Sequence, residues 1–147
     1  MMPYPYGWGG LLDNRDCSMF LRDLFLPFGV FLPRNSKDQA AIEKKGYVDL
    51  SKFSIEEKLD YLKHNAVAFG TLLYMRGHVL LYVGQKDGEP LVLHDVWGFA
   101  YNEDAKEKRF VVGRPVISTL HLGEKHDGFE EKRSLAARLL GVRDITP

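Results

Sequence analysis

The sequence predicts an α+β domain in which N-terminal helices pack on a central antiparallel sheet. Apolar residues recur with helical spacing through the first half of the chain. From residue 69 onward, segments rich in aromatic and β-branched residues alternate with turn signals, as expected for an antiparallel meander. The length of 147 residues suits one domain, so residues 1–147 are predicted to form a single unit.

The first predicted helix begins at or near Cys17, the only cysteine, and Pro27 with Gly29 ends it. Its apolar positions are Phe20, Leu21, Leu24 and Phe25. The partly positive N-terminal end of a helix favours a thiolate over a thiol, so the cysteine is a candidate nucleophile. Since free cysteines are often inert core residues, a purely structural role is the alternative.

Two further helices are predicted to start at capping boxes. Ser36 with Gln39 forms the first box, and Gly46 closes the helix that follows. Ser54 with Glu57 forms the second box, ahead of apolar residues that face inward.

The second half of the chain predicts consecutive strands. Segments Phe69–Met75 and His78–Val83 are separated by a tight turn. The stretch Gln85–Pro90 contains Asp-Gly, the strongest hairpin signal in the chain, and returns it into Leu91–Val96. Segment Phe110–Leu122 is predicted to form two strands.

Three features refine this end of the chain. A charged loop is predicted at Asn102–Lys108, and Arg114-Pro115 indicates an edge or a bulge between two strands. Segment Ser134–Leu140 is predicted to form a short helix that ends before Gly141.

Composition excludes several classes of function. The formal net charge is zero, with 20 basic and 20 acidic residues, so neither nucleic acid nor an anionic membrane surface is an expected partner. No apolar run is long enough for a membrane span, and no signal peptide is visible. A single cysteine cannot form an internal disulfide.

His78 and His94 are the histidines that strands would hold in place. A hairpin pairs residues symmetrically about its turn, so these two lie on neighbouring strands. A two-residue turn at Asp87-Gly88 offsets the pair by about three residues, whereas a loop centred on Lys86 places them directly opposite. A hydrogen bond between them requires that both point to the same face. The alternative is that both are structural core histidines.

A cysteine, a histidine that takes its proton and a polar residue that orients that histidine form the catalytic arrangement of thiol hydrolases. Cys17, His78 and His94 fit these three roles. A zinc site is a weaker alternative, because the two histidines would need Cys17 as a third ligand; no metal or other cofactor is expected.

Together these residues resemble the NlpC-type cell-wall cysteine peptidases, a papain-like family. The resemblance rests on motifs spread over most of the chain: Tyr6-Gly7-Trp8-Gly9-Gly10, Asp16-Cys17-Ser18, Gly77-His78-Val79 with Tyr82-Val83-Gly84, and His94. A subgroup whose catalytic domain follows bacterial Src-homology-three-like modules is similar at Arg15-Asp16-Cys17-Ser18, Pro33-Arg34-Asn35-Ser36 and Leu93-His94-Asp95-Val96-Trp97-Gly98. Such modules are absent from this sequence, and its early first motif is compatible with excision from a longer multi-module protein.

The resemblance implies that Cys17 is the nucleophile, with His78 as general base and His94 as its orienter. It also implies that Tyr6, Asp16 and Ser18 contact the substrate or support the loop around it. One position departs from the family pattern: Met19 stands where a glycine usually follows the serine. This larger residue puts the details of substrate selection in question.

The implied function is hydrolysis of peptidoglycan stem peptides or muropeptides at the γ-D-glutamyl-diamino acid amide bond, through an acyl-enzyme on Cys17. The expected location is the cell envelope or the extracellular space, if the parent protein is exported. The alternatives are a related thiol amidase or acyltransferase, or a catalytically silent cell-wall-binding module.

Overall fold

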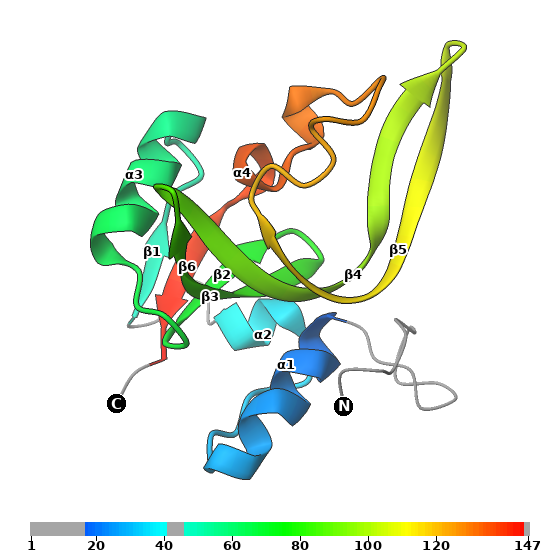
Figure 1. Ribbon diagram of the computed structural model, residues 1–147. Helices are drawn as coiled ribbons and strands as arrows, with labels where there is room; N and C mark the ends of the chain where they lie inside the picture. The colour runs from blue at the N-terminus through cyan, green and yellow to red at the C-terminus, as the bar shows by residue number, and fades with distance from the viewer. Residues whose placement is uncertain (1–16, 41–45, 146–147) are drawn as a thin grey trace.

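The computed structural model describes residues 17–40 and 46–145. In this part of the chain, a six-stranded antiparallel sheet has the order β1-β6-β2-β3-β4-β5. Helices cover both faces of the sheet, and the long β4–β5 hairpin curves away from it (Figure 1). The predicted α+β class is therefore confirmed. Among the described residues, no helix combines the length and the apolar character needed to cross a membrane.

The helices are α1 (Cys17–Phe25), α2 (Ser36–Ala40), α3 (Ile55–Asn65) and α4 (Leu135–Arg138), with 3-10 turns η2 (Leu26–Phe28) and η3 (Glu131–Arg133). The strands are β1 (Tyr47–Asp49), β2 (Thr71–Met75), β3 (His78–Lys86), β4 (Glu89–Glu103), β5 (Lys106–Thr119) and β6 (Gly141–Asp144).

The predicted helix starts at Cys17 and Ser54 are confirmed. At α2 the Gln39 side chain donates to the carbonyl oxygen of Pro33 at 2.7 Å, and the capping box of Ser36 with Gln39 stays a prediction. Helix α1 begins at Cys17, and the turn after it ends at Gly29 with φ of 76°. At α3, the Ser54 hydroxyl accepts from the Glu57 amide at 3.2 Å, and the Glu57 carboxylate accepts from the Ser54 amide at 3.1 Å. The predicted end of the second helix lies outside the described residues.

Two predictions about the strands are wrong. Residues 102–108 do not form a loop: Asp104 and Ala105 alone turn the chain between β4 and β5, with φ of 52° and 60°. This turn contains no glycine, the usual marker of positive φ, so its signal is weak in the sequence. Segment Phe110–Leu122 likewise does not form two strands, because its residues up to Thr119 belong to the single strand β5. Pro115 is tolerated there because β5 is an edge strand, as the sequence indicated.

Two short strands were not predicted. These are β1 and β6; strand β6 lies between β1 and β2 and pairs with both, so the last strand of the described chain is not at the edge of the sheet. Strands β1 and β6 have only 3 and 4 residues, so the alternation of apolar and polar residues along them is too short to be detected in the sequence.

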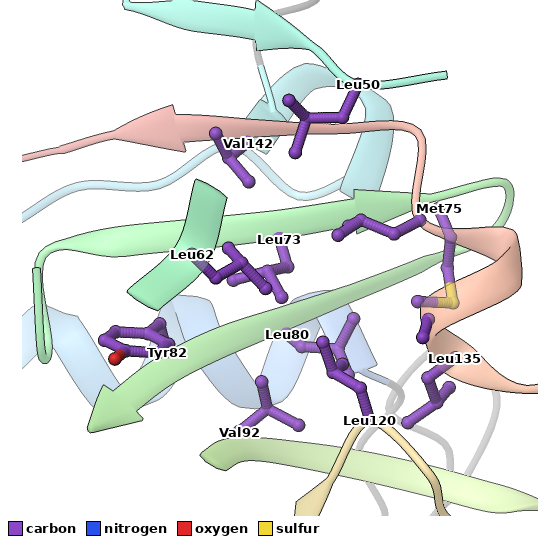
Figure 2. Packing of buried hydrophobic residues seen from close by; sticks show 12 residues of the cluster. Leu50, Leu62, Leu73, Met75, Leu80, Tyr82, Val92, Leu120, Leu135 and Val142 are labelled. Atoms are coloured by element: carbon purple, nitrogen blue, oxygen red, sulfur yellow. The ribbon is translucent and has the colours of Figure 1, made fainter. Parts of the chain in front are cut away.

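The core has two parts, one on each face of the sheet. On one face, Leu73, Leu80 and Val92 pack with Leu62 of α3 and Leu135 of α4 (Figure 2). The opposite face packs against α1 through a second set of buried residues: Cys17, Phe20, Leu21, Leu72, Val79, Leu81 and Leu93. The start of α1 is thereby held against β3.

Candidate active site

A β-bulge decides the relative position of the two histidines. The Asp87-Gly88 turn pairs Lys86 with Glu89, but Val83 has no partner in the ladder. Beyond this extra residue, Leu81 lies opposite Leu93. The offset is the number of residues between His78 and the β3 residue that lies opposite His94. Without the bulge this offset would be three, as predicted, and the two histidines would lie on opposite faces. The register beyond the bulge reduces the offset to two, so His78 and His94 share one face.

The two histidine rings form a hydrogen bond. His78 Nε2 lies 3.0 Å from His94 Nδ1, and the ring centroids are 5.3 Å apart. The other nitrogen of His94, Nε2, lies 2.9 Å from the Ser118 hydroxyl of β5. The expectation that His78 and His94 meet across neighbouring strands is therefore confirmed.

The hydrogen-bond chain fixes which nitrogen carries each proton. The Ser118 hydroxyl donates to the carbonyl oxygen of Thr119 at 3.0 Å, so its oxygen accepts from His94 Nε2–H. The Nδ1 of His94 is then an acceptor, and His78 Nε2–H donates to it. This leaves His78 Nδ1 with a free lone pair, as a general base requires.

Burial keeps both histidines neutral. Desolvation, followed by the charges of His94 and Arg138, lowers the pKa of His78 well below its ordinary value. Desolvation and the charge of Arg138 lower the pKa of His94 to about 4. Neutral rings at neutral pH are consistent with the N–H to N hydrogen bond between them.

Cys17 lies where β3 begins. Its Sγ is 3.8 Å from the carbonyl oxygen of Gly77, the residue before His78, and the side chain is only 4% exposed. Among the described residues, Cys17 and His78 do not share a direct hydrogen bond. In unliganded enzymes such bonds are often long and shorten when substrate binds.

The remaining predicted site residues cannot be placed. Tyr6 and Asp16 lie outside the described residues, and Ser18 belongs to α1 without a described side chain. In residues 17–40 and 46–145, no three His, Cys, Asp or Glu side chains are arranged to hold a metal ion.

Two residues that act on the histidines were not predicted from the sequence. Ser118 accepts from His94, and Arg138 lowers the pKa of both rings through its charge. A polar residue within the apolar segment Val116–Leu120 was a signal for the first. Its partner could not be found without the pairing of β4 with β5.

A cysteine that opens a helix beside a histidine pair on an antiparallel sheet is the arrangement of the papain-like class. Residues 3–98 match the NlpC/P60 family, and the chain belongs to this family. No curated protein matches the chain.

The chain is similar to several solved structures, which include the following two. An NlpC/P60 endopeptidase from Photobacterium damselae subsp. piscicida has a TM-score of 0.80 and 27% identity over 96% of this chain. The peptidoglycan hydrolase RipB from Mycobacterium tuberculosis has a TM-score of 0.51 and 20% identity over 99% of this chain, a likeness of fold. The chain spans 35% of the first structure and 59% of the second.

Proposed function

We propose that this domain is a cysteine peptidase that hydrolyses peptidoglycan stem peptides. The observation that carries the proposal is the chain His78–His94–Ser118 beside Cys17 at the start of α1. Family membership supports it, as does the similarity to an endopeptidase and to a peptidoglycan hydrolase.

In the proposed reaction, His78 Nδ1 takes the proton of the Cys17 thiol as the sulfur attacks the substrate carbonyl carbon. The backbone N–H of Cys17 helps to stabilise the oxyanion that forms. The C–N bond then breaks, and His78 returns the proton to the leaving amine. Water hydrolyses the thioester with His78 again as the base, while His94 holds its ring in place.

The proposed scissile bond joins γ-D-glutamate to the diamino acid, which is lysine or diaminopimelate. Tyr6, Asp16 and Ser18 are proposed substrate contacts. We also propose that the parent protein carries Src-homology-three-like modules and acts in the cell envelope or outside the cell. Met19, half-buried in α1, is the position at which this domain could differ from its relatives in substrate preference.

Product analysis on defined stem peptides tests the proposal. Incubation with N-acetylmuramoyl-L-alanyl-γ-D-glutamyl-diaminopimelate is expected to release a free diamino acid end. Cleavage only at a muramoyl bond would instead indicate an amidase, and transfer to an acceptor other than water an acyltransferase. Binding without turnover would indicate a silent wall-binding module.

Substitution of the nucleophile provides the matched variant. Cys17→Ala is expected to abolish hydrolysis, because no thiol remains to form the acyl-enzyme. The domain should stay folded, since removing one buried sulfur costs about 1–2 kcal/mol of unfolding free energy. Circular dichroism and urea denaturation check the fold, and hydrolysis retained by the folded variant would refute the assignment.

A further inference from the structure

Three arginines line a cavity that the site described above does not include. Arg109 of β5, Arg133 of η3 and Arg138 of α4 line about 220 Å³ together with Glu107 and residues 98–100 of β4. Three guanidinium groups against one carboxylate leave an excess of two positive charges (3 − 1 = 2). The cavity is therefore suited to an anionic group.

The hydrogen bonds in the cavity leave two of these arginines without an ionic partner. Arg133 is paired, since its Nη2 lies 3.0 Å from Glu107 Oε2. Arg138 Nε donates to the carbonyl oxygen of Arg133 at 3.2 Å, which orients the guanidinium and leaves its Nη groups for another acceptor. Within the described part of the chain, no carboxylate lies at ion-pair distance from Arg109 or Arg138.

The charge of Arg138 reaches the proposed catalytic histidines. Partial desolvation and the like charge of Arg109 lower the pKa of Arg138. The charge of Arg138 in turn lowers the pKa of His78 and His94. Arg138 lies two residues before Leu140, whose N–H donates to the carbonyl oxygen of Tyr74 at 2.9 Å, and Tyr74 precedes Met75, the strand partner of His78. The cavity is therefore near the histidine pair, and an anion bound there would relieve repulsion between the two guanidinium groups.

We propose that this arginine cavity binds a carboxylate of the peptide substrate and so provides a second anchoring point beside the histidine pair. The inference rests on the proposed function, because a peptide that carries free carboxylates is the substrate that would supply the anion. The planar fork of a guanidinium matches a carboxylate with two parallel hydrogen bonds. The cavity is open to solvent, and its volume accommodates a carboxyl group and a few carbon atoms.

Kinetics on matched peptides test the site. Defined stem peptides are compared in pairs in which one carboxylate is replaced by a carboxamide. For one such pair, the wild-type domain should prefer the carboxylate by about tenfold or more in kcat/KM, since a charge-assisted hydrogen bond is lost in the amide. Arg138→Gln and Arg109→Gln should bring this ratio near one, because a change in the chemical step affects both peptides of a pair equally and cancels in the ratio.

Lys108→Gln is the matched control, because it removes one positive charge from the residue next to Arg109. Lys108 is paired with Glu103 at 3.3 Å and does not line the cavity, so the carboxylate preference should survive. Loss of the preference in this variant would show that the general field of the hairpin is responsible. An unchanged preference in Arg138→Gln would also overturn the proposal.

A binding experiment separates this proposal from the proposed function. N-acetylglycine, N-acetylglycinamide and inorganic phosphate are titrated separately into the wild-type domain and Arg138→Gln, with ring signals of the histidines followed by NMR. Only the acid should perturb the signals of His78 and His94, and only in the wild type. If no stem peptide is hydrolysed, this titration still decides the cavity: equal effects of acid and amide, or tighter binding of phosphate, would overturn a carboxylate site.

Discussion

Ser118 sets the proton positions of a histidine on the neighbouring strand. Its hydroxyl has one hydrogen, which goes to the carbonyl oxygen of Thr119. The oxygen can therefore only accept from His94, which makes Nδ1 of that ring the acceptor for His78. The Ser118 hydroxyl is thus linked to the proposed base through two successive hydrogen bonds and selects the reactive tautomer of His78. Groups that accept a hydrogen bond from a metal-bound histidine select its tautomer in the same way.

Removing this hydroxyl should slow the chemical step. In Ser118→Ala, the Nε2–H of buried His94 loses its acceptor, and kcat is expected to fall about tenfold with KM within about twofold. Ser118→Thr keeps the hydroxyl and should restore most of the rate. Nitrogen-15 NMR should find a single His94 tautomer in the wild type and in Ser118→Thr, and a mixture in Ser118→Ala; the same tautomer and kcat in all three would exclude this role.

The buried histidines should make stability depend on pH below neutrality. The folded-state pKa of His94 is lowered from 6.5 to about 4, so the unfolded chain binds more protons between these values. The free energy of unfolding should therefore decrease as pH falls through this window, by up to about 3 kcal/mol from this residue. The lowered pKa of His78 acts in the same direction.

Urea denaturation at several pH values measures this dependence. His94→Gln should flatten the slope between pH 6.5 and about 4, because the group that takes up a proton on unfolding is gone. Parallel slopes for wild type and His94→Gln would contradict the assignment.

Within the strands, the bulge in β3 is the feature that determines on which face of the sheet His78 lies. Side chains alternate between the two faces of a strand, so one extra residue reverses the face of everything beyond it. Val83 is that residue, and Gly84 follows it with a φ of 135°, a backbone angle that residues with a side chain rarely adopt. The bulge brings His78 to the face of His94.

Gly84→Val should therefore separate the proposed catalytic pair, because a residue with a side chain rarely adopts the φ of 135° found at the bulge. With the Asp87-Gly88 turn kept and the bulge lost, Val83 enters the ladder, the offset returns to three residues, and His78 points away from His94. Hydrolysis should fall to background even in the fraction of protein that remains folded. NMR of the ring nitrogens should show that the hydrogen bond between the histidines is lost.

Gly88→Ala controls for damage to the hairpin. Gly88 has a φ of 79°, so alanine there strains the turn and costs about 1 kcal/mol or more without changing the register. Its activity per folded molecule should match wild type. Activity retained in Gly84→Val would mean that the bulge does not determine the site.

Across the whole molecule, a buried lysine joins the two helices on the face that carries the histidines. Lys58 of α3 donates to the carbonyl oxygens of Ala136 and Ala137 of α4, at 3.4 and 3.1 Å. Desolvation lowers its pKa. These contacts join segments 78 and 79 residues apart in sequence, and they fix the short helix that ends with Arg138.

Replacing Lys58 by methionine keeps the stem and removes the donor. We expect Lys58→Met to lower the free energy of unfolding by about 1–3 kcal/mol, because two carbonyl oxygens of α4 lose the charged group that donates hydrogen bonds to them. Lys63→Met, at an exposed position of the same helix, should change it by less than about 0.5 kcal/mol. The midpoint of urea denaturation measures both, and equal shifts would argue against the role of Lys58.

Local signals explain how much of the fold the sequence predicted. The capping box at Ser54, the Asp-Gly turn at residues 87–88 and the helix that starts at Cys17 each depend on neighbours within a few residues. The turn at Asp104-Ala105 has the same backbone form without glycine and was missed. Strands β1 and β6 were missed because their pairing partners lie far away in the sequence.

The sequence by itself determined the candidates, Cys17 and the two histidines, because residue type and spacing are local properties. Which face His78 occupies was decided only in the folded sheet, through one unpaired residue in β3. Ser118 and Arg138 reach the histidines from strands and helices that follow later in the chain, so their roles required the tertiary structure. Long-range register and burial set proton positions and pKa values, and neither can be calculated from spacing along the chain.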